Sequence, residues 1–365
     1  MAASKKKIKK PSPKKRVVKK TKKKLTALSL RKSIHNPIIK PTSDTAWQSK
    51  ATFNPTALYH DGKVHIVYRA IGESDESVLG YASSVDGVRI TDKSRDVAYR
   101  HTNKGYVKKI LPQISYSSGG GWGGGCEDPR LTLLERRAYL LYTAFDGWGS
   151  IRIALNSISL DDFISKHWNW QKPVLISPPG EINKNWVLFP DKIKGKYAIL
   201  HGLSPEILID YFDDLDELDG EHFIKSIHQG SPLWYKRDRG IRGVGPAPIK
   251  TKYGWLVLYH AMDKVNPSQY KLWAMILDLK NPKKILYRGI EPILEPDESY
   301  ENYGFKAGVV YSCGAVVKDG ELFVYYGGAD TVSCVATANF DKFLKELVTS
   351  KPSKLTGRKT RARVN

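Results

Sequence analysis

The stretch ALYHDGKVHIVYRA, residues 57–70, has the pattern of a β-hairpin: two β-rich runs joined by the turn DGK. An Asp-Gly pair between runs rich in Val, Ile and Tyr is a strong short-range hairpin signal. The same plan recurs four more times, and each second run carries a Tyr or His near its end. The other copies are RLTLLERRAYLLYTAF (130–145), VLFPDKIKGKYAILHG (187–202), PAPIKTKYGWLVLYHAM (246–262) and GAVVKDGELFVYYGGAD (314–330).

A further β-prone segment follows each hairpin, and the hairpin ends recur every 58 to 74 residues. Repeats made only of strands and turns at such spacing are typical of a β-propeller. The pattern therefore predicts an all-β fold, a five-bladed β-propeller. A sandwich of ordinary hairpins is the alternative, which five similar units in order disfavour. Helices are expected only at 160–167 and 340–347.

The net charge of +22 lies almost entirely at the two ends of the chain. Residues 1–32 contain 15 Lys and Arg, residues 351–365 contain six more, and neither end has an acidic residue, which leaves about +1 for the body. We predict a disordered basic tail at 1–32, a catalytic propeller at 33–350 and a basic C-terminal tail at 351–365. Such tails either hold anionic polymers or surfaces weakly or are simply solvated. The nearly neutral body argues against a nucleic-acid-binding propeller.

Three scattered cysteines, Cys126, Cys313 and Cys334, form neither a disulfide framework nor a CxxC metal motif. They favour a reducing, cytoplasmic location. No apolar run reaches the roughly 18 residues of a membrane span, and no apolar segment follows the N-terminal charges as in a signal peptide. No motif suggests a metal ion or an organic cofactor.

The glycine-rich segment GGGWGGG (119–125) directly precedes the acid pair Glu127-Asp128, which Pro129 and Arg130 follow. Adjacent residues of a strand point to opposite faces, so only one of the two carboxylates is expected to face the centre. The other is expected to brace Arg130 or a backbone amide. Pro129 is expected to hold Asp128 extended. An ordinary edge salt bridge with Arg130 is the purely structural alternative.

Several motifs together resemble glycoside hydrolase family 130, the β-mannoside phosphorylases and related β-mannosidases. The similarity runs in order from about residue 50 to about residue 347 and covers all five repeats. It implies a five-bladed β-propeller. The motifs are NP at 54–55, YRA at 68–70, CEDPR at 126–130, KNWVLFPDKIKGKYAILH at 184–201, GPAPIKTKYGWLVLYH at 245–260, EPIL at 291–294 and CGAVVKDGELFVYYGGADT at 313–331.

The resemblance implies inverting phosphorolysis of β-mannosides, with Asp128 donating the proton to the leaving glycosidic oxygen. An inverting hydrolase needs a second carboxylate to activate water. Phosphate is already an anionic nucleophile and instead needs cations to hold it, so inorganic phosphate is the implied co-substrate. By position, the resemblance assigns substrate binding to Asn54, Arg69, Ser84, Arg130, Tyr259, His260 and Asp330, and phosphate binding to Lys184, Asn185 and Arg242.

The expected phosphate site departs from the family pattern. Lys184 stands where family phosphorylases present an arginine, Gly202 stands where a second arginine follows His201, and Arg242 replaces a lysine. Lysine is a poorer bidentate ligand for phosphate than arginine. An inverting β-mannosidase therefore stays open as an alternative, as does a non-catalytic carbohydrate-binding propeller. The linkage, the acceptor sugar and the oligomeric state also stay open. Candidate bases for the hydrolase are Asp146, Asp191 and Asp263.

Overall fold

The computed structural model describes residues 28–101, 124–145, 151–204, 206–226, 241–263 and 266–349. The predicted tails at 1–27 and 351–365 and most of the glycine segment, 119–123, lie outside these residues. The described residues are almost entirely β-strand, and the predicted all-β class is confirmed. Two α-helices lie at the predicted places, α1 (Leu160–Ile164) and α3 (Phe340–Thr349). No helix of the described ranges is long and apolar enough to cross a membrane.

The strands form five consecutive antiparallel groups, which we call units 1 to 5. Unit 1 contains β2 (Ala51–His60), β3 (Lys63–Ile71), β4 (Ser77–Ser84) and β5 (Asp92–Lys93). Unit 2 contains β6 (Gly125–Leu134), β7 (Arg137–Phe145), β8 (Ile151–Ser159) and β9 (Val174–Leu175). Unit 3 contains β10 (Val187–Leu188), β11 (Tyr197–Gly202) and β12 (Leu208–Phe212). Unit 4 contains β13 (Ile241–Val244), β14 (Ile249–Thr251), β15 (Gly254–Met262), β16 (Tyr270–Leu277) and β17 (Ile285–Arg288). Unit 5 contains β18 (Val310–Lys318), β19 (Glu321–Gly328), β20 (Val332–Asn339) and, from the start of the chain, β1 (Arg31–Lys32). Short 3₁₀ turns lie at η1 (Ala46–Gln48), η2 (Leu215–Glu217) and η3 (Ser299–Glu301).

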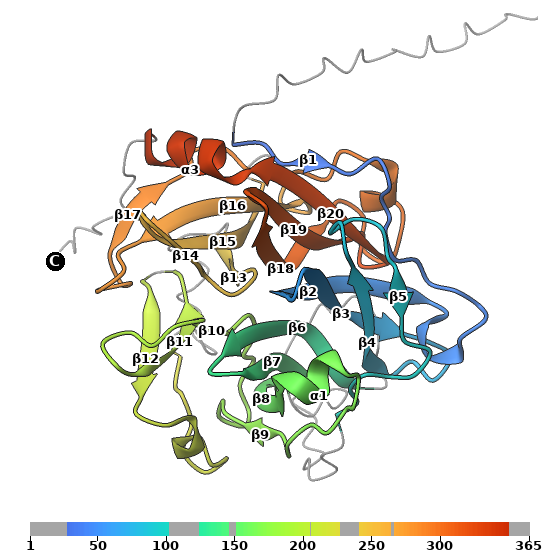
Figure 1. Cartoon of the computed structure of the whole chain (residues 1–365), viewed down its shortest axis with the longest axis horizontal. Helices are drawn as coiled ribbons and strands as arrows, with labels where there is room; N and C mark the ends of the chain where they lie inside the picture. The colour runs from blue at the N-terminus through green and yellow to red at the C-terminus, as the bar shows by residue number, and fades with distance from the viewer. Residues whose placement is uncertain are drawn as a thin grey trace, which may run out of the picture.

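The five units are arranged in a ring (Figure 1). Each unit contacts the next along the chain, and β18 of unit 5 packs on β2 of unit 1, which closes the ring. The first strand of each of the five units (β2, β6, β10, β13 and β18) lies nearest the centre of the view in Figure 1. A single parallel pair, Ser77 with Gly125, also joins the edges of units 1 and 2 near the start of β6.

The hydrophobic core lies between the units. Five large clusters of buried side chains fill the five interfaces, and the last of them packs unit 5 on unit 1. Each sheet therefore buries both faces, which explains why its strands are nearly continuous apolar runs. Burying each large apolar side chain stabilises the fold by roughly 1.5–3 kcal/mol. The inner ends of the strands are left for polar residues.

The N-terminal segment belongs to the fold from residue 28 onward. Strand β1 pairs antiparallel with β20, and Leu28 and Leu30 are buried in the cluster between units 4 and 5. The predicted end of the disordered tail at residue 32 is therefore wrong, because residues 28–32 complete the sheet of unit 5. The alternation Leu28-Ser29-Leu30 is typical of a strand. The lysine-rich composition of the segment before it nevertheless placed these residues in the predicted disordered tail.

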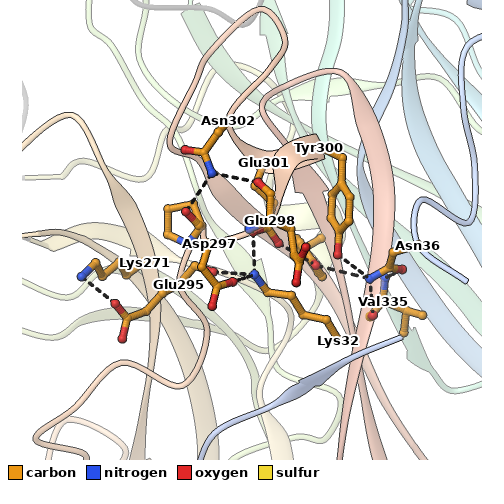
Figure 2. A network of polar contacts seen from close by, with 12 residues as sticks. Lys32, Asn36, Lys271, Glu295, Asp297, Glu298, Tyr300, Glu301, Asn302 and Val335 are labelled. Carbon is orange, nitrogen blue, oxygen red and sulfur yellow. Dashed lines mark hydrogen bonds and ion pairs between the residues drawn. The ribbon is translucent and has the colours of Figure 1, made fainter. Parts of the chain in front are cut away.

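A buried ion pair anchors this segment (Figure 2). The Lys32 Nζ donates to Glu301 Oε2 at 2.5 Å and to the carbonyl oxygen of Glu295 at 2.7 Å, and it also contacts Asp297. Glu301 is fully buried and accepts a further hydrogen bond from the Tyr326 hydroxyl at 2.9 Å. We call Lys32 and Glu301 the N-terminal clasp, since together they join the start of the chain to η3.

Candidate active site

The inner strands carry matching irregularities at the centre of the ring. The pairing register shifts in β2 after Phe53, in β6 after Glu127, in β13 before Gly243 and in β18 before Gly314. Such bulges bend a strand and redirect its side chains. Because the inner strands of four of the five units carry such a bulge, equivalent backbone positions of these units face the same central space.

Three polar residues at the inner strands of units 1, 2 and 3 occupy left-handed backbone positions. Asn54 has φ 47°, Asp128 has φ 50° and Asn185, just before β10, has φ 66°. Asn and Asp tolerate this region better than other residues with a side chain. The left-handed position strains the backbone by about 1–3 kcal/mol per residue and persists only where the surrounding structure holds it. Backbone strain at three neighbouring units therefore marks the centre as the functional site.

The two adjacent carboxylates both point to this centre, contrary to the expectation from strand alternation. Arg69 Nη2 donates to Glu127 Oε1 at 2.9 Å, and Arg69 Nη1 donates to Asp128 Oδ1 at 3.4 Å. The expectation that Pro129 keeps Asp128 extended is also wrong, because Asp128 is the left-handed residue of the bulge. Arg130 forms no edge salt bridge with either carboxylate among the recorded ion pairs of the described residues; its Nη1 donates to the carbonyl oxygen of Asp128 at 2.7 Å.

Asp128 is held as a carboxylate by its surroundings. The side chain is 3% exposed, and Asn54 Nδ2 donates to its Oδ1 at 2.7 Å. Burial alone would raise the pKa of Asp128, but the positive charges of Lys184, Arg69 and Arg130 and the bond from Asn54 lower that pKa to about 2. Asp128 is thus ionised at neutral pH in the protein without substrate.

Arg69 is the buried cation that joins units 1 and 2. It is 2% exposed, its Nε donates to Ser77 Oγ at 2.6 Å, and its guanidinium lies 4.7 Å from the centroid of the Phe53 ring. Glu127 also contacts Lys184, whose Nζ lies 3.5 Å from Glu127 Oε2. The planar guanidinium suits this position because it can bind two carboxylates in fixed geometry.

Arg130 ties three units together on the other side of Asp128. Its Nε donates to the Gly245 carbonyl oxygen at 2.9 Å, and its Nη2 donates to Asn185 Oδ1 at 3.0 Å. The Tyr311 hydroxyl donates to the same Asn185 oxygen, and Asn185 Nδ2 donates to the Arg242 carbonyl oxygen at 2.8 Å. Asn185 therefore links units 2, 3, 4 and 5 at the centre.

His260 presents a hydrogen-bond donor to the site. Its ring stacks on Tyr311 with centroids 4.1 Å apart, and its Nε2 accepts a hydrogen bond from the Ser312 backbone amide at 2.9 Å. Burial, followed by the charge of Arg130, lowers the pKa of His260 to about 3. The ring is therefore neutral with its proton on Nδ1. Within the described residues this buried Nδ1 has no hydrogen-bond partner, so it can donate a hydrogen bond to a bound ligand.

Two predicted substrate residues lie away from the centre. Tyr259 precedes His260 in β15 and points to the opposite face, where it packs between units 3 and 4 and accepts a hydrogen bond from Arg288 Nε at 2.8 Å. Ser84 lies at the far end of β4, and its Oγ donates to Asp86 Oδ1 at 3.0 Å. These two assignments are corrected, because strand alternation and strand length separate both side chains from Asp128.

The structure also places at the site four residues to which the sequence assigned no catalytic or binding role. Ser77 occupies the inner end of β4, Tyr311 replaces Tyr259 as the aromatic residue, Glu127 bridges Arg69 and Lys184, and Lys306 lies over the Tyr270 ring. Their sequence signals were ordinary: a strand serine, a strand tyrosine, one of two adjacent acids and a loop lysine. The other predicted residues (Asn54, Arg69, Asp128, Arg130, Lys184, Asn185, Arg242, His260 and Asp330) lie in or beside the cluster.

Comparison with known proteins identifies the family. Residues 20–348 match the family model of glycoside hydrolase family 130, described as beta-1,4-mannooligosaccharide phosphorylase. The chain belongs to glycoside hydrolase family 130. Within family 130 it is 37% identical to a 1,2-beta-oligomannan phosphorylase of Thermoanaerobacter sp. over 85% of this chain and 97% of that protein. It is 35% identical to a beta-1,2-mannobiose phosphorylase from the same organism, over 84% and 96% of the two chains.

The fold also agrees with a solved family 130 structure. The beta-1,2-mannobiose phosphorylase of Listeria innocua, solved with β-1,2-mannobiose, aligns with a TM-score of 0.64. The alignment covers 88% of this chain and 99% of that chain at 24% identity, so it compares the folds alone.

The candidate site contains a further buried carboxylate, Asp330, with an electrostatic balance opposite to that of Asp128. Burial raises the pKa of Asp330 to about 6, Asp128 adds to the rise, and Lys306, Arg69 and Lys184 oppose it. Arg69 and Lys184, which lower the pKa of Asp128, therefore only partly offset the rise that burial causes in the pKa of Asp330. Environments that separate the pKa values of two carboxylates are characteristic of acid–base sites.

Replacing Asp330 with asparagine is expected to stabilise the fold at neutral pH. The pKa of Asp330 rises from 3.8 to about 6 on folding, so its contribution to stability is complete below pH 3.8 and is lost as pH rises through 6. Asp330→Asn should gain up to about 3 kcal/mol in unfolding free energy at pH 7.5, and the gain should shrink toward pH 4. Denaturant unfolding at several pH values measures it.

The matched control is Asp319→Asn. Asp319 has the same φ of 50° as Asp330 but lies in an exposed turn. Its replacement should change stability by less than about 0.5 kcal/mol at every pH. A less stable Asp330→Asn protein at pH 7.5 would contradict the prediction.

Proposed function

We propose that this chain is an inverting β-mannoside phosphorylase with the fold of a five-bladed β-propeller. It transfers a mannosyl group from a β-1,2-linked mannoside to inorganic phosphate and releases mannose 1-phosphate. The observation that carries the proposal is the position of Asp128, buried at the centre of the ring among cations from three units. The family and the names of the 37% and 35% identical relatives support the reaction and the linkage.

The carboxylates suggested for water activation support phosphorolysis rather than hydrolysis. Asp191 pairs with Lys250 at the surface, and Asp263 pairs with Lys271 at 2.5 Å. Asp146 lies outside the described residues. Both described candidates are therefore engaged by lysines, whereas phosphate needs only cations, here Lys184 and Arg242 beside Asn185.

The protonation of Asp128 follows from phosphate binding in this proposal. Lys184 and Arg69 keep the carboxyl ionised in the absence of phosphate. A bound phosphate anion offsets their charge, which raises the pKa of Asp128. Phosphate arriving as the monoanion can pass its proton to Asp128 and remain as the dianion. Each turnover would then bring its own proton.

The chemical step then balances. A phosphate oxygen forms a bond to the anomeric carbon from the face opposite the leaving group, and the bond from that carbon to the glycosidic oxygen breaks. Asp128 gives its proton to that oxygen, directly or through a hydroxyl of the bound mannose. In this proposal His260 Nδ1–H and Asn54 Oδ1, which have no hydrogen-bond partner among the described residues, bind sugar hydroxyls.

Product analysis tests the proposal. The purified chain is incubated with β-1,2-, β-1,3- and β-1,4-mannobiose, with and without inorganic phosphate. We expect mannose 1-phosphate from the β-1,2 compound only when phosphate is present. Free mannose at a rate indifferent to phosphate would instead establish an inverting β-mannosidase. Binding of mannobiose without either product would establish a non-catalytic carbohydrate-binding protein.

A further inference from the structure

The phosphate cluster lacks one cation when it is read along the sequence. Gly202 follows His201, so unit 3 has no side chain there to hold an anion. Lys184 and Arg242 are the two predicted phosphate ligands that bear a charge. Two side-chain cations would only balance the charge of a phosphate dianion, so a third cation from another unit would strengthen its binding.

Lys306 in the loop between η3 and β18 meets this requirement. Its Nζ lies 4.4 Å from the centroid of the Tyr270 ring, and the guanidinium carbon of Arg242 lies 5.5 Å from the same centroid. One aromatic ring therefore supports both cations, which come from units 4 and 5. Lys306 is partly buried, so its charge is less screened than that of a surface lysine.

The backbone of this loop is fixed beside Asp330. The Lys306 amide donates to the Ala329 carbonyl oxygen at 3.0 Å, and the Phe305 amide donates to Thr331 Oγ1 at 3.0 Å. A Cβ atom at Gly304 would lie 2.3 Å from Thr331 Oγ1, so this close approach requires glycine. Further along, the Gly308 amide donates to the Glu301 carbonyl oxygen at 2.9 Å. The loop is thus tied to the turn that carries Asp330 and to the N-terminal clasp.

Lys306 also acts electrostatically on the central cluster. Among the charges that keep the pKa of Asp330 from rising further, Lys306 has the largest effect, ahead of Arg69 and Lys184. Lys306 therefore lies close enough to Asp330 for its charge to act on that carboxyl, on the side where it shares the Tyr270 ring with Arg242.

We propose that Lys306 is the third cation of the phosphate site, placed there by unit 5 in compensation for the missing side chain after His201. This inference rests on the proposed phosphorylase function. It makes Lys306 a binding residue for the nucleophile: its ammonium group would donate a charge-assisted hydrogen bond to a phosphate oxygen. Alternatively, Lys306 would only position Asp330 for binding of the sugar. Its loss would then raise the KM for the mannoside and not the KM for phosphate.

The test compares Lys306→Met, Lys306→Arg and the control Lys196→Met, which removes the same charge from a surface pair with Asp213. The readouts are the KM for phosphate, the KM for β-1,2-mannobiose, and the affinity for inorganic phosphate alone by calorimetry. We expect Lys306→Met to weaken phosphate binding about 10- to 100-fold and to leave the KM for mannobiose within about twofold. Lys306→Arg should restore most of the phosphate affinity, and Lys196→Met should behave as the wild type.

The outcomes separate this inference from the proposed function. An unchanged phosphate affinity with a raised KM for mannobiose would overturn it, because Lys306 would then serve the sugar through Asp330. If the wild type binds phosphate but forms no mannose 1-phosphate, the proposed function fails, and weaker phosphate binding by Lys306→Met still supports the site. If the wild type binds no phosphate, both are overturned. Denaturant unfolding of each variant confirms that the fold is intact.

Discussion

The Asp128→Asn protein is expected to lose phosphorolysis of β-1,2-mannobiose by about 10²- to 10⁴-fold in kcat, with the products unchanged. The amide occupies the same space and can still accept the hydrogen bond from Asn54 at Oδ1. Its N–H protons are not acidic enough to be transferred to the glycosidic oxygen. The loss should be confined to kcat, because the groups that bind the sugar and phosphate stay in place. Initial rates with and without phosphate measure it.

A substrate with a better leaving group sharpens this test. The oxygen of a nitrophenyl β-mannoside leaves as a stable phenolate and needs little help from an acid. Asp128→Asn should therefore retain far more of its activity on the aryl mannoside than on mannobiose. Equal losses on both substrates would show that Asp128 acts through positioning. Full activity on mannobiose would remove Asp128 from the mechanism, and Asp319→Asn is the control for the loss of one carboxylate.

The same variant should also be less stable than the wild type, in contrast to Asp330→Asn. Folding lowers the pKa of Asp128 from 3.8 to about 2, so this carboxylate contributes stability above pH 3.8 that is lost as pH falls through 2. Its replacement should cost about 2 kcal/mol at pH 7.5. Two isosteric substitutions in one site should thus shift the unfolding free energy in opposite directions.

The second large effect is expected at the N-terminal clasp. Lys32→Met should lower the unfolding free energy by about 3 kcal/mol at pH 7.5, because it leaves the fully buried Glu301 without its cation. Burial already raises the pKa of Glu301, and the loss of Lys32 raises it further. A raised pKa means that stability is present at low pH and lost as pH rises. The deficit of the variant should therefore grow with pH, which denaturant unfolding measures.

The neighbouring residue offers a matched control. Arg31 lies in the same short strand, but its side chain is 71% exposed and reaches Glu321 only at 3.5 Å. Arg31→Met should change stability by less than about 0.5 kcal/mol. Adding Glu301→Gln to Lys32→Met should restore part of the stability, since the buried charge is then removed. Equal effects of Lys32→Met and Arg31→Met would show that the clasp does not stabilise the ring.

The repeating plan of the fold can be predicted from local sequence patterns. The five hairpins, the all-β class and both helices follow from local patterns, since turn residues and strand-forming runs act over a few neighbours. The resemblance of the motifs YRA and CEDPR to the family pattern assigned roles to Arg69 and Asp128. Those residues lie at the centre because each occupies the inner end of its strand in a repeated unit.

The assembly of the site depends on contacts between units that local sequence patterns do not specify. The left-handed bulge at Asp128 turns both acids toward Arg69, and local propensity opposes that conformation, so contacts between units must hold it. The choice of Ser77 over Ser84 depends on which end of β4 faces the centre. The places of Lys32 and Lys306 depend on partners hundreds of residues away or in another unit. Such contacts leave no periodic signal in the chain, because closing the ring brings together residues that the sequence keeps apart.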